Sequence, residues 1–268
     1  MTYRTTLCLT LAILAGCGGM RQASAPIYEL RATQSPLEYA AEVQSLTIIE
    51  TPGGEQEIRM TTTLALTLSY GSRTADGLPF EVVFSEYASE GPGPDLSAML
   101  GHPFRGTVSD AGEVELTESP DLDIPWFDGT AMAEVINPLM IPLPPGGLLT
   151  EDAWSLERTQ KPGGGMTGAT SFDGSVRVAS DTIWNGIPAR IIVSSGDIRT
   201  RATGTPPGAP GKVDVDTEGE SESTYVWDPA RGIVLQVSVT TEMDGRVSTQ
   251  GMVLPLTIET TSTYALVE

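Results

Sequence analysis

Long segments of alternating apolar and polar residues constrain the fold of this chain more than any other feature of its sequence. Between residues 58 and 70, most even-numbered positions are apolar and most odd-numbered ones are Arg, Thr or Ser. The same alternation recurs in residues 80–84, 172–178, 233–239 and 254–266. A period of two places one face of a β-strand against a core and the other against solvent. The sequence therefore predicts a mainly β protein built from antiparallel strands.

Several of these segments exceed ten residues, whereas strands in globular proteins usually have about five or six. Because twist accumulates along a strand, we expect a long, strongly curved antiparallel sheet, either a half-barrel or barrel-like. The Pro- and Gly-rich segment 140–149 leaves an alternative open, a β-sandwich of two halves joined near residues 140–150. Within residues 37–48 the apolar positions change parity, which predicts a β-bulge near Gln44 or Ser45.

Two segments of the sequence have helical features. Residues 95–100 are long enough for about one turn. Asp128, a favourable N-cap residue, precedes apolar residues at helical spacing, namely Met132, Val135, Ile136 and Leu139. Pro138 is expected to end or kink this second helix. We expect the short apolar helix to cover the open side of the curved sheet.

The N-terminus has the layout of a bacterial secretory signal. Arg4 precedes an apolar run, residues 7–14, that is too short to cross a bilayer as a permanent helix. The next feature resembles the lipobox of bacterial lipoproteins at all four positions, Leu14, Ala15, Gly16 and Cys17. The resemblance implies that signal peptidase recognises the first three residues and cuts before Cys17. It also implies that Cys17 receives lipid, including an acyl chain such as palmitate.

This resemblance divides the chain into a signal peptide (residues 1–16), a lipidated cysteine with a polar tether (17–26) and a single β-rich domain (27–268). The lipid chains are expected to anchor the protein to a membrane. Gly18 stands where an aspartate favours inner-membrane retention in well-studied Gram-negative bacteria, so we expect an outer-membrane location facing the periplasm. The mature domain contains no cysteine for a disulfide, a thiolate nucleophile or a metal site.

Charge and residue counts exclude several classes of function. The chain has 15 basic and 35 acidic residues, a formal net charge of −20, and one histidine. Such a protein repels nucleic acids, and one histidine cannot build a multi-histidine metal site. His102 has no nucleophile motif nearby, and the chain has no phosphate-binding or dinucleotide-binding motif. We therefore predict a protein that is not an enzyme and has no cofactor, metal or catalytic residue.

Five acidic residues occupy the even positions of one expected strand, namely Asp214, Asp216, Glu218, Glu220 and Glu222. Their spacing does not match a Ca²⁺-binding loop, whose oxygens converge through a turn. A solvated strand face that discourages edge pairing explains the pattern better. Arg199 and Arg201 share a face of the preceding strand, so we expect cross-strand ion pairs between the two strands.

Acidic and aromatic residues also gather just before the expected second helix. Asp121, Asp123 and Asp128 flank Trp126 and Phe127, an arrangement compatible with paired carboxylates at a carbohydrate site. Nothing in the sequence fixes the separation of these carboxylates, and a helix cap explains Asp128 better. We therefore treat a glycosidase as the less favoured interpretation.

Several turn motifs resemble a pattern in uncharacterised bacterial lipoproteins. Residues 96–104 end in Leu-Gly-His-Pro-Phe and lead into residues 108–114, whose turn reads Asp-Ala-Gly-Glu-Val. Residues 142–154, with Pro-Leu-Pro-Pro and Glu-Asp-Ala-Trp, and the hairpin at residues 225–232 are similar to later parts of that pattern. The resemblance covers most of residues 28–268 and implies a strand-rich fold without an activity to transfer. In architecture only, the layout also resembles periplasmic half-barrel lipoprotein carriers.

Two functions from different classes remain open. The first is a non-enzymatic module whose concave sheet face binds an apolar ligand or lipid. It predicts a pocket of several hundred Å³ lined by Met, Leu and aromatic side chains. The alternative is a structural or interaction lipoprotein with a filled core and an acidic surface that binds a partner. The composition favours the first, and the sequence identifies no protein partner.

Overall fold

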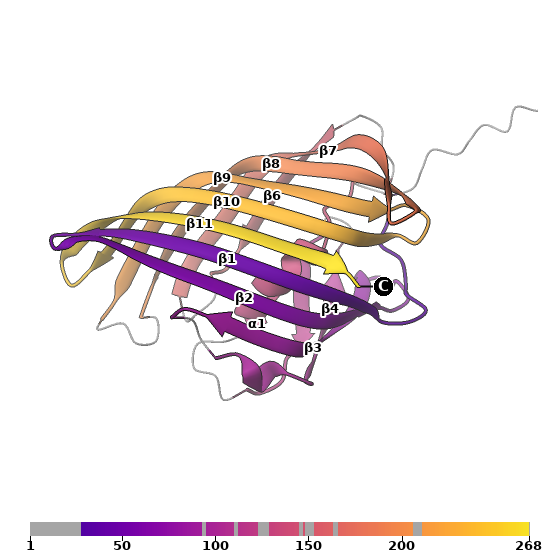
Figure 1. Ribbon diagram of the computed structural model, residues 1–268, viewed down its shortest axis with the longest axis horizontal. Coiled ribbons are helices and arrows are strands. Elements are labelled where there is room, and N and C mark those ends of the chain that lie inside the picture. The colour runs from indigo at the N-terminus through magenta and orange to yellow at the C-terminus, as the bar shows by residue number, and fades with distance from the viewer. Residues whose placement is uncertain are drawn as a thin grey trace, which may run out of the picture.

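The computed structural model describes residues 28–92, 95–109, 112–122, 129–144, 147, 153–162, 166–205 and 211–267. Eleven strands in these residues form one antiparallel sheet with the order β5-β4-β3-β2-β1-β11-β10-β9-β8-β7-β6 (Figure 1). The strands are β1 (Leu37–Thr51), β2 (Gly54–Tyr70), β3 (Leu78–Glu90), β4 (Pro103–Val108), β5 (Val114–Glu118), β6 (Ala153–Gln160), β7 (Met166–Trp184), β8 (Ile187–Gly204), β9 (Val213–Asp228), β10 (Ile233–Thr249) and β11 (Met252–Leu266). The prediction of a mainly β protein with long antiparallel strands is confirmed.

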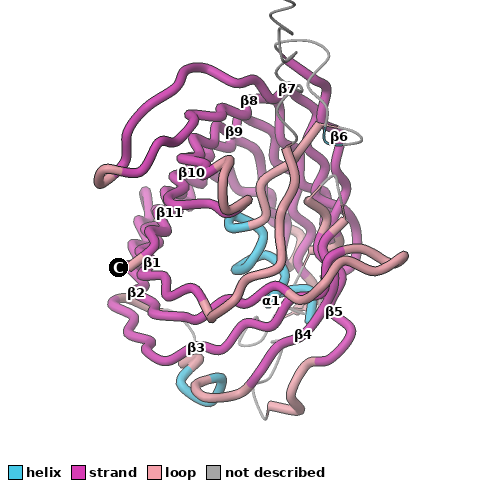
Figure 2. Tube along the Cα trace, turned by 90° about the vertical axis from the view of Figure 1, so that its right-hand side faces the viewer, coloured by secondary structure: helices cyan, strands magenta, loops and turns pink. Residues whose placement is uncertain are grey.

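The sheet curls into an open ring, with β5 and β6 as its two edges (Figure 2). The prediction of a strongly curved sheet is therefore confirmed, and the sandwich alternative is wrong. Segment 140–150 does lie between the first five strands and the last six. However, Tyr39 to Ile49 of β1 pair with Leu266 to Leu256 of β11, and this ladder joins both groups of strands into one sheet.

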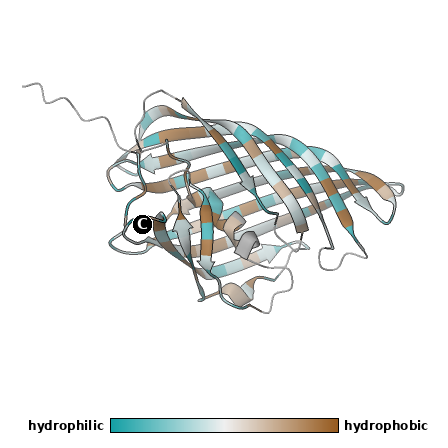
Figure 3. Ribbon diagram, turned by 180° about the vertical axis from the view of Figure 1, so that it is seen from behind, coloured by the Kyte–Doolittle hydropathy of each residue, from teal (hydrophilic) through white to brown (hydrophobic). Residues whose placement is uncertain are grey.

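Apolar and polar residues alternate along many of the strands, as the bands of hydropathy in Figure 3 show. Since successive side chains point to opposite faces, this alternation separates a concave face from a convex face. In β2, the side chains of Leu64, Leu66, Leu68 and Tyr70 are buried. Ala65 and Thr67, between them, face the opposite side and are half-buried. Burial of the apolar side chains on one face gives the sheet its core.

The predicted β-bulge near Gln44 or Ser45 is wrong. β1 pairs with β2 and with β11 without a register shift at these residues. The parity changes because β1 extends beyond the filled part of the core after Val43, and from there both faces of the strand are partly exposed. Leu46 and Ile48 therefore lie on the convex face of a regular strand. Register shifts occur instead in other pairs of strands, including β9 with β10 at Val234.

A short helical segment fills part of the concave side. Helix α1 (Gly129–Ile136) continues into the 3₁₀ helix η2 (Asn137–Leu139), so α1 ends just before Pro138, as predicted. A second 3₁₀ helix, η1 (Ser97–Met99), lies within the expected turn at residues 95–100. We call residues 132–143 the plug; its fully buried side chains are Met132, Ile136, Leu139, Met140 and Ile141. The proposed cap Asp128 lies outside the described residues.

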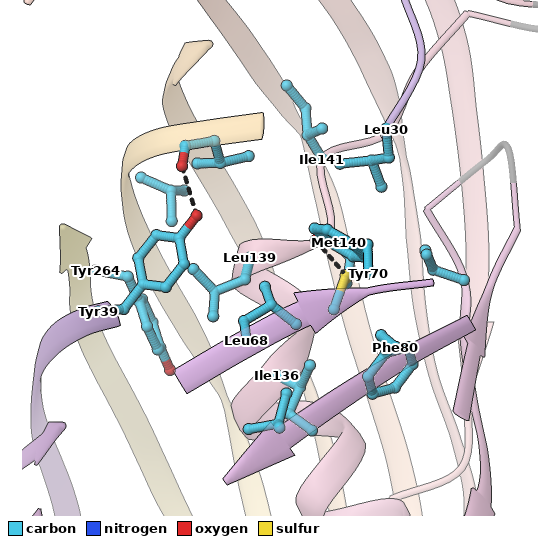
Figure 4. Packing of buried hydrophobic residues seen from close by; sticks show 14 of the residues in the cluster. Leu30, Tyr39, Leu68, Tyr70, Phe80, Ile136, Leu139, Met140, Ile141 and Tyr264 are labelled. Carbon is cyan, nitrogen blue, oxygen red and sulfur yellow. Dashed lines mark hydrogen bonds between the residues drawn. The ribbon is translucent and has the colours of Figure 1, made fainter. Parts of the chain in front are cut away.

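Tyrosine hydroxyls link separate strands of the sheet and link the sheet to the plug (Figure 4). Tyr39 donates a hydrogen bond of 2.6 Å to the carbonyl oxygen of Val234, and Tyr70 contacts the sulfur of Met140 at 3.3 Å. Tyr264 of β11 donates to the carbonyl oxygen of Val135 at 2.9 Å. Each ring contributes apolar area to the core while its hydroxyl satisfies a polar group there.

Candidate ligand-binding site on the concave face

The plug fills only one part of the concave side. Beyond it lies a cavity of about 340 Å³, whose floor is the sheet and whose side is the turn around η2. It is lined by Asn137, Pro138, Pro142, Leu156, Arg158, Gln160, Thr170, Phe172, Ser194, Ile198, Ser221, Ser223, Tyr225, Val239, Thr241 and Thr260. The strands that contribute are β6 to β11. A cavity of this size is within the range of small-molecule sites.

Glycines keep the floor of the concave side free of large side chains. Gly219 of β9 and Gly245 of β10 have the same parity as the inward-facing Ser221 and Val237 of their strands. A methyl group at Gly219 would lie 1.9 Å from the carbonyl oxygen of Glu242, and one at Gly245 would lie 2.1 Å from that of Asp216. Because neighbouring backbones approach so closely, only glycine fits at these positions.

Hydroxyl groups in and beside the cavity pair with one another across strands. The hydroxyls of Ser221 and Thr241 are 2.9 Å apart, and those of Thr170 and Thr200 are 3.0 Å apart. These pairs satisfy polar atoms internally, which reduces the cost of placing hydrocarbon against them. Together with Leu156, Phe172 and Val239 they form a lining that suits an amphipathic ligand.

The lining differs in one respect from the pocket expected from the sequence. Leucine and aromatic residues are present, as Leu156, Phe172 and Tyr225. Among the described residues that line the cavity there is no methionine. Met132 and Met140 are instead fully buried in the plug, where they fill the core.

Arg158 places a positive charge inside the cavity. It lies on β6, directly opposite Phe172 of β7, and has the parity of the apolar Trp154 and Leu156. Burial lowers the pKa of its guanidinium, and Tyr225 and Glu113 oppose this shift. Arginine remains charged at neutral pH despite such a shift. Arg158 is not among the site residues expected from the sequence, although its position among the inward-facing residues of an alternating strand is a signal for it.

A second space, of about 580 Å³, separates the two edges of the sheet. Residues 113–116 line it on the β5 side, residues 158–161 line it on the β6 side, and Ala133 and Asn137 contribute from α1 and η2. We call this space the seam. It has Asn137, Arg158 and Gln160 in common with the concave cavity, so the two spaces adjoin.

A larger depression of about 780 Å³ lies over β1, β2, β3 and β11. It includes small residues such as Ala40, Ala65 and Ala88 together with the carboxylates of Glu42 and Glu86. Few of its side chains are large enough to enclose hydrocarbon. The concave cavity, with aromatic and branched apolar side chains, is therefore the stronger candidate for an apolar ligand.

The predicted acidic series lies on the convex face of β9, and its ion pairs with β8 are confirmed. Arg201 contacts Asp216 at 3.4 Å, and Arg199 contacts Glu218 at 3.8 Å. Asp216 also contacts Arg246 of β10 at 3.1 Å. Partial loss of hydration opposes ionisation of Asp216, but the neighbouring arginines outweigh it and lower the pKa of this carboxyl. These contacts explain the acidic series as an exposed, partly paired strand face.

The register of the sheet also aligns acidic residues that the sequence analysis did not connect. One row crosses six neighbouring strands and consists of Glu157, Asp173, Asp197, Glu220, Glu242 and Glu259. We call it the acidic row; all of its side chains are exposed. Within the described residues, no group of three or more His, Cys, Asp or Glu side chains is placed to hold a metal ion.

Other residues singled out from the sequence do not enter this site. Leu14, Ala15, Gly16 and Cys17 lie outside the described residues, as do Asp123, Trp126 and Phe127. Asp128 lies outside them as well, so the predicted pairing of carboxylates at residues 121–128 stays a prediction. His102 is exposed after η1, where its backbone N–H donates to the carbonyl oxygen of Met99. No helix in the described part of the chain is long and apolar enough to span a membrane.

Comparison with solved structures supports the description of the fold. Lipovitellin, in a structure described as "Lipid-protein interactions in lipovitellin", matches 87% of this chain with a TM-score of 0.50 and 15% identity. The chain spans about a quarter of lipovitellin, since the match covers 25% of that chain. At this identity the likeness shows a similar fold and nothing more.

Two further structures match most of this chain with lower scores. DynF from the dynemicin biosynthesis pathway of Micromonospora chersina has a TM-score of 0.24 and 10% identity, over 90% of this chain and 85% of that one. A putative outer membrane lipoprotein-sorting protein domain from Vibrio parahaemolyticus has a TM-score of 0.18 and 9% identity, over 85% of each chain. These scores are too low to establish a shared fold. No protein-family model and no curated protein sequence matches the chain.

Proposed function

We propose that this protein is a membrane-anchored envelope lipoprotein that binds an apolar ligand or lipid on the concave face of its sheet. The supporting observation is the cavity of about 340 Å³ beside the plug, with Leu156, Phe172 and Val239 in its lining. Cys17 is the proposed site of acylation, and the outer membrane, on its periplasmic side, is the proposed location. In this proposal the protein is not an enzyme and acts by holding its ligand.

The cavity supports this function better than the fold does, because one fold can serve many functions. Beside a well-filled core, this space has a lining that combines branched, aromatic and small hydroxyl side chains. Such a space suits hydrocarbon, whose transfer from water is favourable in proportion to the apolar area that is buried. The lipid–protein interactions named for lipovitellin are a second, weaker support.

Ligand binding can be tested in living cells with a long-chain fatty acid that has both a photoactivatable group and a chemical tag. After irradiation, we expect light-dependent label on peptides of the cavity lining in the full-length protein. Ser221→Phe fills the cavity and is expected to remove most of this label, whereas Ser195→Phe on the exposed face is expected to leave it unchanged. Absence of light-dependent label from the concave face of the unaltered protein would contradict ligand binding.

The same cells test the anchor, because acylation needs no light. We expect light-independent label on the N-terminal peptide that begins with Cys17. Cys17→Ala removes the acceptor thiol and is expected to abolish this label and release the protein from the membrane fraction. Cys8→Ala, within the expected signal peptide, is the matched control and is expected to change neither result. Label that persists in Cys17→Ala would disprove acylation at this residue.

A structural or interaction lipoprotein remains the alternative, and the acidic row is the observation that favours it. Six exposed carboxylates in register give the convex face a strong negative field. This alternative predicts association with a basic envelope component that weakens as the salt concentration rises. Retention of a partner by the Ser221→Phe variant, together with absence of any ligand, would favour it over the binding module.

A further inference from the structure

The concave cavity and the seam form adjoining spaces of different chemistry. The cavity has branched and aromatic side chains such as Phe172, Ile198 and Val239, whereas the seam is bounded by the backbones and charged side chains of two edge strands. Asn137, Arg158 and Gln160 line both spaces. A molecule in the cavity therefore has one apolar end and one end that reaches polar groups.

Arg158 stands at the junction of the two spaces. A methyl group at Gly112, in the turn before β5, would lie 2.6 Å from Nη2 of Arg158 and 2.8 Å from the carbonyl oxygens of Met140 and Ile141. The guanidinium therefore lies against that turn and the backbone of the plug. In the described lining of the concave cavity, Arg158 is the one charged residue. Lys161 follows it in the seam, where Glu113 and Glu115 face these two cations.

The setting of Arg158 differs from that of the arginines on the convex face. Arg199, Arg201 and Arg246 lie on that exposed surface and contact Asp216 within 3.1 to 3.7 Å. Arg158 is instead partly buried and lines the concave cavity beside Leu156 and Phe172, and Glu113 stabilises its charged form. Arg158 thus supplies guanidinium N–H donors at the polar end of a cavity whose other described lining residues are uncharged, and such donors favour an anionic acceptor.

We propose that the ligand is an amphiphile with an anionic head group, a carboxylate or a phosphate, that accepts hydrogen bonds from the guanidinium of Arg158 at the seam. This inference rests on the proposed function and names the chemical class of the ligand. The hydrocarbon chain lies in the concave cavity, and the head group lies between the two sheet edges with Lys161 behind it. The guanidinium fork suits either anion, because both present two oxygens at the required spacing.

The experiment uses the full-length protein, purified from the envelope into nanodiscs of phosphatidylcholine. The probes are a photoactivatable long-chain fatty acid and the primary alcohol of the same chain, and the readout is the probe concentration that half-saturates light-dependent label on concave-face peptides. Arg158→Gln is expected to raise this concentration about tenfold or more for the acid, the scale of a lost charged hydrogen bond, and to leave it unchanged for the alcohol.

Two further variants define the cause. Arg177→Gln removes an exposed arginine from the convex face of β7 and is expected to leave the half-saturating concentration of both probes unchanged. Arg158→Lys keeps the positive charge without the planar fork. Its half-saturating concentration for the fatty acid is expected to lie between those of the unaltered protein and Arg158→Gln. The neutral alcohol also reports whether each variant still forms the cavity.

A measurement on the unaltered protein covers the case in which Arg158→Gln does not fold. Non-photoactive fatty acid and monoalkyl phosphate are each expected to displace the fatty-acid probe at lower concentrations than the alcohol of the same length. The stronger of the two anions identifies the preferred head group.

Each contrary result has a separate meaning. Equal loss of acid and alcohol labelling in Arg158→Gln, or no loss of either, would overturn the inference about the head group. Equal displacement by the acid, the phosphate and the alcohol would overturn it as well. Failure of every probe to label the concave face of the unaltered protein would overturn the proposed function itself.

Discussion

Four buried tyrosines share the property that their hydroxyls are removed from water. Burial raises the pKa of Tyr39, Tyr70, Tyr225 and Tyr264 above the ordinary value of 10.0. In the folded state these groups keep protons that the unfolded chain releases above about pH 10. The stability that they contribute is therefore fully present below that pH and is lost as the pH rises further.

We predict that the free energy of unfolding falls steeply above about pH 10. Tyr39→Phe removes one of these hydroxyl groups together with its hydrogen bond to the carbonyl oxygen of Val234. At neutral pH it is expected to cost about 1 kcal/mol, and above pH 10 its deficit relative to the unaltered protein should shrink. Urea titrations across this pH range measure both effects. A deficit that grows with pH would contradict the argument.

Gly219 illustrates a second constraint that acts on a single residue. We predict that Gly219→Ala destabilises the protein by about 2 kcal/mol, because the new methyl group would meet the carbonyl oxygen of Glu242 at 1.9 Å. Gly53→Ala, where the nearest atom is 3.7 Å away, is the matched control and should change stability little. Thermal unfolding of both variants measures the difference. Equal melting temperatures would show that the sheet relaxes around the added group.

At the scale of elements, the sequence could predict what depends on local pattern. Alternation located the long strands, and helical spacing located α1, because each pattern reflects burial of one face. Alternation failed as a guide in the second half of β1. Both faces of the strand are partly exposed after Val43, so odd and even positions no longer distinguish a core face from a solvent face. Alternation also could not predict the acidic row or the seam, since these depend on which residues face one another across strands. Arg158 combines both situations. The strand that holds it could be predicted from local pattern, but the position of β5 beside it could not.

Like charges in the acidic row oppose the pairing of the strands that hold them. Glu220 lies directly between Asp197 of β8 and Glu242 of β10. We predict that Glu220→Lys stabilises the protein by a few tenths of a kcal/mol and that the gain shrinks at high salt. Glu222→Lys makes the same change of charge opposite the neutral Ser195 and Thr240, so its gain should be smaller. Equal gains in both variants would indicate an effect of net charge alone.

For the whole molecule, the proposed ligand binding would be coupled to stability through the open form of the sheet. The β1–β11 ladder joins the two groups of strands, while β5 and β6 remain unpaired with each other across the seam. A ligand that contacts both the concave face and the seam binds only the folded ring. It therefore stabilises the folded state by mass action, in proportion to the logarithm of its concentration relative to its dissociation constant.

Removal of the ligand is accordingly predicted to lower the melting temperature. Protein extracted with organic solvent and refolded without lipid should regain about 2 to 3 kcal/mol when a long-chain fatty acid is added at about one hundred times its dissociation constant. Ser221→Phe, with its cavity filled, should show no increase in stability when the fatty acid is added. Ser195→Phe should be stabilised as much as the unaltered protein. Calorimetry with and without the fatty acid separates these outcomes. A gain in Ser221→Phe as large as that of the unaltered protein would place the stabilising contact outside the concave cavity.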